Sequence, residues 1–195
     1  MTKKQKTVLW IGTAIAGTLL TVVLLAGEIA PAILRSYCKL SYRDKIGSYS
    51  REYRLDPYFV CGVIFTESKF DPNAKSRVGA SGLMQVMPAT GAEIARQLDL
   101  PYSDEMLFDP ETSIRFGTFY LRQQMDAFDN NPAVVLAAYN AGPYRAEQWL
   151  SQYGLDSEGK ICYIPFQETD QYVDRVLLMQ KVYRILYPKA FEIDS

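Results

Sequence analysis

Prolines mark the places where helices can begin in this chain. Pro57, Pro88, Pro110 and Pro132 each precede a stretch long enough for a helix, and proline is favoured at the first helical position because its missing N–H needs no partner there. The predicted helices cover residues 41–53, 57–68, 88–98, 110–128, 132–141, 143–153 and 167–187. Residues 154–166 are predicted to form an irregular loop. Because no segment shows convincing strand alternation, we expect an all-α or α-dominated fold.

The size and composition suit one folded domain with an appendage. The chain has 195 residues, of which 48% are apolar and 22% are charged, as in globular proteins rather than disordered ones. Its formal net charge is −1, and without residues 1–27, which hold three lysines and no acid, 18 basic and 22 acidic side chains leave −4. A nucleic-acid binder would show a basic excess, so no nucleic-acid partner is expected.

The chain contains no histidine, which excludes Ser-His and Cys-His catalysis. Cys38, Cys61 and Cys162 lack the CxxC spacing of zinc sites, so no metal is expected. Cys61 is expected to be a small buried residue, with a Cys61–Cys162 disulfide as a minor alternative. Acid–base chemistry near neutral pH must therefore use carboxylates, tyrosines or lysines, and no cofactor is expected.

The N-terminal segment has the pattern of a membrane anchor. Lys3, Lys4 and Lys6 precede Val8–Gly27, which is 20 residues without a charge, or about 30 Å of helix, enough to cross a bilayer. The lysines should remain cytoplasmic, which places the rest outside. We therefore predict an anchor over residues 1–28, a short stalk over 29–40 and a folded domain over 41–190. A cleaved signal peptide followed by secretion is the alternative.

Glu67 is the candidate general acid. It ends the predicted helix over 57–68, and Ile64, Val63 and Val60 lie three, four and seven residues before it. This spacing places the carboxyl group on an apolar stripe. Burial disfavours the charged form and should raise the pKa of Glu67 toward neutral pH, as a general acid requires. The alternative is a glutamate at a helix end that extends into water.

Four motifs follow one another along the chain. They are Glu67-Ser68, Gly-Leu-Met-Gln-Val-Met-Pro over 82–88, Ala-Tyr-Asn-Ala-Gly over 138–142, and Pro-Phe-Gln-Glu-Thr-Asp-Gln-Tyr-Val over 165–173. In this order they resemble the catalytic domain of SLT-type lytic transglycosylases, over roughly residues 41–187. The resemblance implies a lysozyme-like fold and, as substrate, the β-1,4-linked N-acetylmuramic acid and N-acetylglucosamine strands of peptidoglycan.

The resemblance also implies a mechanism that uses a single carboxylate. Glu67 would protonate the leaving glycosidic oxygen and then, as a carboxylate, remove the proton from the C6 hydroxyl of the same muramic acid. The product would carry a 1,6-anhydro end. The matching substrate-binding positions are Ser76, Gln85, Met87, Tyr139, Asn140, Glu168 and Tyr172. Of these, Glu168 is expected to orient the site rather than to transfer protons.

Two positions are expected to be structural. Asp71 is the next acid after Glu67, and the run Phe-Asp-Pro-Asn indicates a turn in which the Asp71 carboxylate bonds to nearby backbone. Ser113 stands where the family usually has asparagine, and we expect this position to belong to the scaffold.

Two other functions remain open from the sequence. The first is a goose-type lysozyme-like hydrolase that uses the same glutamate but admits water. The second is a glycan-binding or envelope-assembly protein without catalysis, against which the presence of Glu67 argues. The sequence identifies neither a protein partner nor a physiological role among wall remodelling, division, secretion and sporulation.

Overall fold

The computed structural model describes residues 31–192. The chain separates into two units after Lys39, and in the first of them residues 31–37 are helical. The predicted anchor, Val8–Gly27, lies outside the described residues. Among residues 31–192, no helix is both long enough and apolar enough to cross a membrane.

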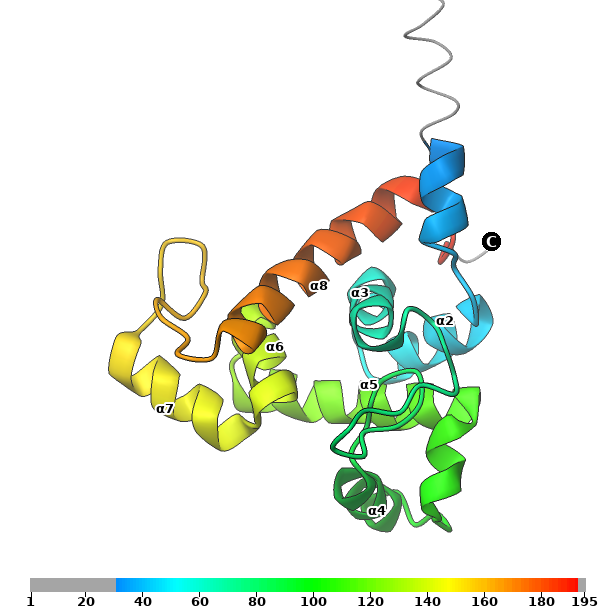
Figure 1. Ribbon diagram of the computed structural model, residues 1–195, viewed down its shortest axis with the longest axis horizontal. Helices are drawn as coiled ribbons and strands as arrows, with labels where there is room; N and C mark the ends of the chain where they lie inside the picture. Colours follow the sequence, from blue (N-terminus) through cyan, green and yellow to red (C-terminus); the bar gives the residue numbers. More distant parts are fainter. Residues whose placement is uncertain (1–30, 193–195) are drawn as a thin grey trace, which may run out of the picture. The chain divides into compact units, whose positions relative to one another are not determined.

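The second unit is helical, and the predicted all-α class is confirmed (Figure 1). The elements are α2 (Arg43–Glu52), α3 (Pro57–Ser68), α4 (Pro88–Gln97), the 3₁₀ helix η1 (Asp104–Phe108), α5 (Pro110–Ala127), α6 (Pro132–Ala141), α7 (Pro143–Tyr153) and α8 (Gln167–Leu186). Each predicted helix is present, with ends that differ by at most two residues. The helix predicted over 41–53 begins at Arg43 because Tyr42 has a left-handed backbone, with φ 57°. The short η1 was not predicted.

Local hydrogen bonds explain why helices begin where the prolines stand. Five helices, α3 to α7, have proline in the first turn. The Asp56 side chain accepts a hydrogen bond from the Tyr58 N–H at the start of α3, and Asp109 accepts one from the Thr112 N–H at the start of α5. Such caps satisfy backbone donors that have no partner within the helix.

Helix α3 lies at the centre of the core. It packs against both α8 and α2, and all residues from Tyr58 to Phe65 are buried. The prediction of a single apolar stripe on this helix is therefore wrong, because neighbouring elements cover every face. Gly62 permits the close approach of α8, since a Cβ at this position would lie 2.7 Å from the backbone oxygen of Val176.

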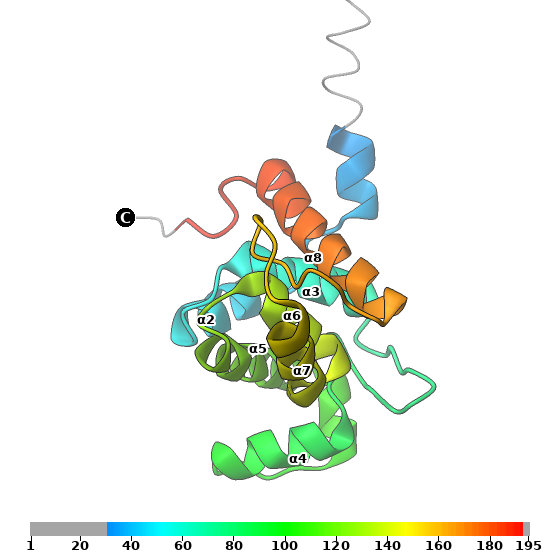
Figure 2. The same ribbon diagram turned by 90° about the vertical axis from the view of Figure 1, so that its left-hand side faces the viewer.

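Helix α5 lies between α3 and α4 in both views (Figures 1 and 2). The loop over 69–87 crosses from α3 to α4 and is held by isolated bridges that pair Ser81 with Lys75 and with Val86. Gly117 on α5 leaves room for Met84 of this loop, because a Cβ at Gly117 would lie 2.3 Å from the Met84 sulfur. The loop is thereby fixed against α5.

Candidate active site

Glu67 lies in the last turn of α3 and is half-buried. The Tyr172 hydroxyl of α8 donates a hydrogen bond to Glu67 Oε1 at 2.7 Å. Burial raises the pKa of Glu67 from 4.5 to about 7; the bond from Tyr172 acts in the opposite direction, and the charge of Glu168 raises the pKa further. Glu67 can therefore hold a proton at neutral pH and release it, which is what a general acid and base requires.

The end of α3 fixes the position of this carboxyl group. The Ser68 hydroxyl lies 2.8 Å from the Leu83 carbonyl oxygen and 3.1 Å from that of Ile64, which ties the last turn to the 69–87 loop. Lys69 and Phe70 then adopt left-handed backbones, so the helix cannot continue. Asp71 is exposed and accepts a hydrogen bond from the Asn73 N–H at 2.9 Å, which confirms its predicted role in the turn.

A groove of about 230 Å³ lies between the start of α4, the middle of α5 and the end of α6. Its lining residues are Gln85, Val86, Met87, Thr90, Tyr120, Tyr139, Asn140, Ala141 and Gly142. The structure thus brings together four of the predicted substrate-binding positions, Gln85, Met87, Tyr139 and Asn140. It also adds Tyr120, which was not predicted.

Existing hydrogen bonds determine which polar atoms of the groove remain for a ligand. The Gln85 side-chain NH₂ donates to the carbonyl oxygens of Ala74 and Gly82, both at 3.0 Å. Asn140 Oδ1 accepts from the Thr169 hydroxyl at 2.7 Å. Within the described residues this leaves Gln85 Oε1 as an acceptor and Asn140 Nδ2 as a donor. Together these two atoms complement the N–H and C=O of an amide.

Two tyrosines, the half-buried Tyr139 and the buried Tyr172, lie near the acid. Tyr139 donates a hydrogen bond to the Met84 carbonyl at 2.8 Å, and its ring packs at 5.5 Å from that of Tyr120. Burial raises the pKa of Tyr139 and that of Tyr172 well above 10, and the charge of Glu67 adds to both effects. Both hydroxyls therefore keep their protons at neutral pH. Neither can replace Glu67 as a base.

The remaining predicted positions lie outside the groove lining. The Ser76 hydroxyl accepts a hydrogen bond from the Ala80 N–H at 2.9 Å within the 69–87 loop. Glu168 is exposed in the first turn of α8 and acts on Glu67 through its charge. Tyr172 contacts Glu67 directly, so its position indicates a role in orienting the acid. Contact of these residues with substrate stays a prediction.

Ser113 and the cysteines have structural positions. The Ser113 hydroxyl is fully buried and accepts a hydrogen bond from the Met84 N–H at 3.2 Å, which supports the loop that carries Gln85. Cys61 and Cys162 are free thiols, so the alternative of a Cys61–Cys162 bridge is wrong. Cys61 is buried in α3, and burial raises the pKa of its thiol. Residues 31–192 contain no group of three side chains suited to a metal ion.

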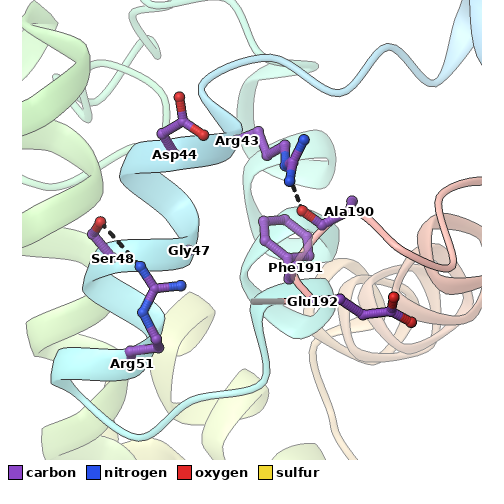
Figure 3. A pocket seen from close by; sticks show the side chains of 8 residues that line it. All are labelled: Arg43, Asp44, Gly47, Ser48, Arg51, Ala190, Phe191 and Glu192. Carbon is purple, nitrogen blue, oxygen red and sulfur yellow. Dashed lines mark hydrogen bonds between the residues drawn. The ribbon is translucent and has the colours of Figure 1, made fainter. Parts of the chain in front are cut away.

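A second cavity, of about 330 Å³, lies between α2 and residues 190–192 (Figure 3). Here Arg43 donates a hydrogen bond to the Ala190 carbonyl, and the Phe191 ring meets that of Tyr58 edge-on at 5.1 Å. The two acids that line it, Asp44 and Glu192, are both exposed. Because this cavity offers no buried acid, the groove and Glu67 are the candidate active site.

The contacts of Glu67 predict opposite pH shifts for two substitutions. Tyr172→Phe removes the hydrogen bond that lowers the pKa of Glu67, so the acid should stay protonated to higher pH and the alkaline limb of the pH–rate profile should move up. Glu168→Gln removes a charge that raises this pKa, so the limb should move down. Profiles of kcat/KM for the two variants provide the measurement. Shifts in the same direction would contradict the opposite effects assigned to Tyr172 and Glu168 on the pKa of Glu67.

The chain matches a family model described as "Transglycosylase SLT domain" over residues 44–161. It is 39% identical over 149 residues to the soluble lytic murein transglycosylase of Escherichia coli K12. The matched segment covers 74% of this chain and 23% of the relative. It is 37% identical over 112 residues to the membrane-bound lytic murein transglycosylase C of Shigella sonnei, covering 52% of this chain and 31% of that protein. The chain thus spans about a quarter of the length of the first of these relatives.

Solved structures show the same fold. The 70 kDa soluble lytic transglycosylase from Escherichia coli matches with a TM-score of 0.72 and 36% identity, covering 81% of this chain and 26% of that chain. A 70 kDa soluble lytic transglycosylase in complex with bulgecin A matches with a TM-score of 0.71 and 37% identity, covering 78% of this chain and 25% of that one. An inactive mutant of lytic transglycosylase Slt from Pseudomonas aeruginosa matches with a TM-score of 0.71 and 34% identity, again covering 78% and 25%.

Proposed function

Because this chain belongs to the transglycosylase SLT domain family, we propose that it is a peptidoglycan lytic transglycosylase with Glu67 as its acid and base. The observation that carries the proposal is one half-buried carboxyl group with a pKa of about 7, held by Tyr172. None of the residues that line the neighbouring groove is an aspartate or a glutamate, and the acid whose charge acts on Glu67, Glu168, is exposed in the first turn of α8. Glycosidases that hydrolyse with two carboxylates need both beside the scissile bond, and this site favours a route that needs only one.

The proposed reaction begins with protonated Glu67. Its proton passes to the glycosidic oxygen as the bond from C1 of muramic acid to that oxygen breaks. The Glu67 carboxylate then takes the proton of the C6 hydroxyl of the same sugar, and the C6 oxygen bonds to C1. The product has a 1,6-anhydro end, no water is consumed, and Glu67 is again protonated.

The groove supports an N-acetylated sugar as the ligand. Gln85 Oε1 can accept from the N–H of an acetamido group, and Asn140 Nδ2 can donate to its carbonyl. The apolar Met87 side chain, which is 41% exposed and lines the groove, offers a surface to the acetyl methyl group. Since both amides are held by other protein groups, their orientation is fixed before the ligand binds.

The products of wall digestion test the proposal. Purified sacculi treated with the full-length protein should release fragments with 1,6-anhydromuramic ends, which are one water lighter than fragments with reducing ends. Mass spectrometry of the released fragments distinguishes the two. Reducing ends would identify the alternative, a lysozyme-like hydrolase. Binding without release of fragments would identify a glycan-binding protein.

We further propose that Val8–Gly27 anchors the protein in the cell membrane, with the catalytic domain on the extracytoplasmic side where peptidoglycan lies. The support is the uncharged run of 20 residues preceded by three lysines, a pattern that favours cytoplasmic lysines and an exported C-terminal part.

Fractionation of cells should find the protein in the membrane at its full mass of 22.1 kDa. Extraction should require detergent, because an apolar segment about 30 Å long is stable only in lipid. A soluble mature form that begins near residues 27–31 would instead establish that the segment is a cleaved signal peptide.

A further inference from the structure

The groove itself offers no charge to a ligand. Its lining consists of two side-chain amides, two tyrosines, one threonine and apolar or backbone groups. The sequence from residue 28 onward has a net charge of −4, so a negatively charged substrate is repelled overall. An anionic substrate group beside this groove would need a local cation.

Arg145 supplies a cation at the rim of the groove. Its Nη1 donates a hydrogen bond at 3.1 Å to the carbonyl oxygen of Ala141, which lines the groove. Its guanidinium carbon lies 5.2 Å from the centre of the Phe166 ring. The side chain is thus held between the end of α6 and the residue before α8, two positions before Glu168.

These contacts orient the guanidinium but occupy only one of its hydrogen-bond donors. A guanidinium has five N–H donors, and within the described residues Arg145 uses one of them. Arg145 is exposed, so the other donors face solvent. The charge is favourable at the end of α6, but it also lies in the first turn of α7, where a cation opposes the helix dipole. Helix stability therefore gives little reason for an arginine here.

We propose that Arg145 binds a carboxylate of the peptide stem that muramic acid carries. The inference rests on the proposed function, because the stem belongs to the peptidoglycan substrate. The stem leaves the sugar through its lactyl group and bears carboxylates, and arginine binds carboxylates through paired N–H donors. Arg145 then makes the protein prefer strands with stems over bare glycan.

Binding measured without turnover tests this inference. Full-length Glu67→Gln protein is titrated with soluble glycan strands that carry stems and with the same strands after an amidase has removed the stems and the freed lactyl carboxylates have been converted to methylamides. Adding Arg145→Gln should weaken binding of stem-bearing strands by at least about tenfold, since one charge-assisted hydrogen bond alone contributes about that much, and leave binding of stripped strands unchanged. Arg145→Lys should keep part of the preference, and high salt should reduce it.

Arg54→Gln is the matched control. Arg54 is exposed and lines a different cavity together with Arg122 and Asp126. Its replacement should therefore weaken binding of neither the stem-bearing nor the stripped strands. If Arg145→Gln weakens both kinds of strand equally, Arg145 only maintains the shape of the groove and the inference is wrong. If it weakens neither, the inference is also wrong. In both cases anhydro products from the wild-type protein would still support the proposed function, so the two failures are distinguishable.

Discussion

Glu67→Gln should lower the cleavage rate by at least about 10²–10⁴-fold, the contribution typical of a general acid. Glutamine keeps the shape of the side chain and can still accept the hydrogen bond from Tyr172, but it has no proton to donate to the glycosidic oxygen. The rate of fragment release from sacculi provides the measurement. Activity above a tenth of the wild-type value would remove Glu67 from its assigned role.

The same substitution should raise the free energy of unfolding at alkaline pH, whereas a damaged fold would lower it. The pKa of Glu67 is about 7 in the folded protein and ordinarily 4.5, so below pH 4.5 the group is protonated in both folded and unfolded states. As the pH rises from 4.5 toward 7, Glu67 loses its proton in the unfolded state but keeps it in the folded state. The free energy of unfolding therefore falls over this range. Glutamine avoids this loss, so the variant should be more stable than wild type at pH 8 by about 3 kcal/mol, and not at pH 4.

Asp71→Asn is the control for the loss of a carboxylate. Asp71 accepts a hydrogen bond from the Asn73 N–H in an exposed turn, and the asparagine carbonyl can accept the same bond. The variant should keep most of its activity and release the same anhydro product. If Asp71→Asn abolishes cleavage in a folded protein, a mechanism with two carboxylates is the better account.

Gly82→Ala should have the largest effect on stability. Gly82 has a φ of +76°, and a Cβ built there would lie 1.9 Å from the Leu107 carbonyl oxygen and 2.8 Å from Ser113 Oγ. Backbone strain of about 1–3 kcal/mol adds to an overpacking cost of about 1–3 kcal/mol. Since the Gly82 carbonyl also holds the Gln85 side chain, binding of glycan should weaken as well.

Gly79→Ala separates these two costs. Gly79 lies in the same loop with a φ of +96°, and nothing lies within 4 Å of a Cβ built there. This variant carries the backbone strain without the contact, so its denaturant midpoint should fall much less than that of Gly82→Ala. Equal losses in the two variants would contradict the close packing of the loop against η1.

The helices could be predicted from the sequence because their signals are local. Pro57 and Pro132 follow capping side chains, Asp56 and Asn131, that bond to the first backbone donors of their helices. Tyr42 marks the limit of this reasoning. Its left-handed backbone, which delays the start of α2, has no signal in the residue type, because left-handed conformations favour glycine or asparagine rather than tyrosine.

The burial of Glu67 was predicted for a reason that is only partly right. Glu67 does lie among buried residues, but α3 is buried on all faces, so helical spacing alone could not identify the side on which the acid lies. Burial raises its pKa most, and the two residues that adjust the pKa further, Tyr172 and Glu168, lie about a hundred positions away in the sequence. Such contacts depend on how α8 packs against α3, which no local pattern contains.

The groove, too, could be predicted from the sequence only in part. The motif residues Gln85, Tyr139 and Asn140 were predicted and line it. Tyr120 was not, because a tyrosine on a helix that packs on two neighbours has the same pattern as a core residue. Gln85 has a left-handed backbone, with φ 47°, and this conformation appears only once the bridges of the 69–87 loop are known.

The origin of the oxygen atoms in the product tests the central claim most directly. Sacculi digested by the full-length protein in water enriched in heavy oxygen should give fragments whose new muramic ends carry no label, because the C6 hydroxyl of the sugar itself attacks C1 after Glu67 has protonated the leaving oxygen. A hydrolase would place one labelled oxygen at C1 of each new end. Unlabelled anhydro ends are the result that we predict, and labelled reducing ends would contradict the single-carboxylate transglycosylase mechanism.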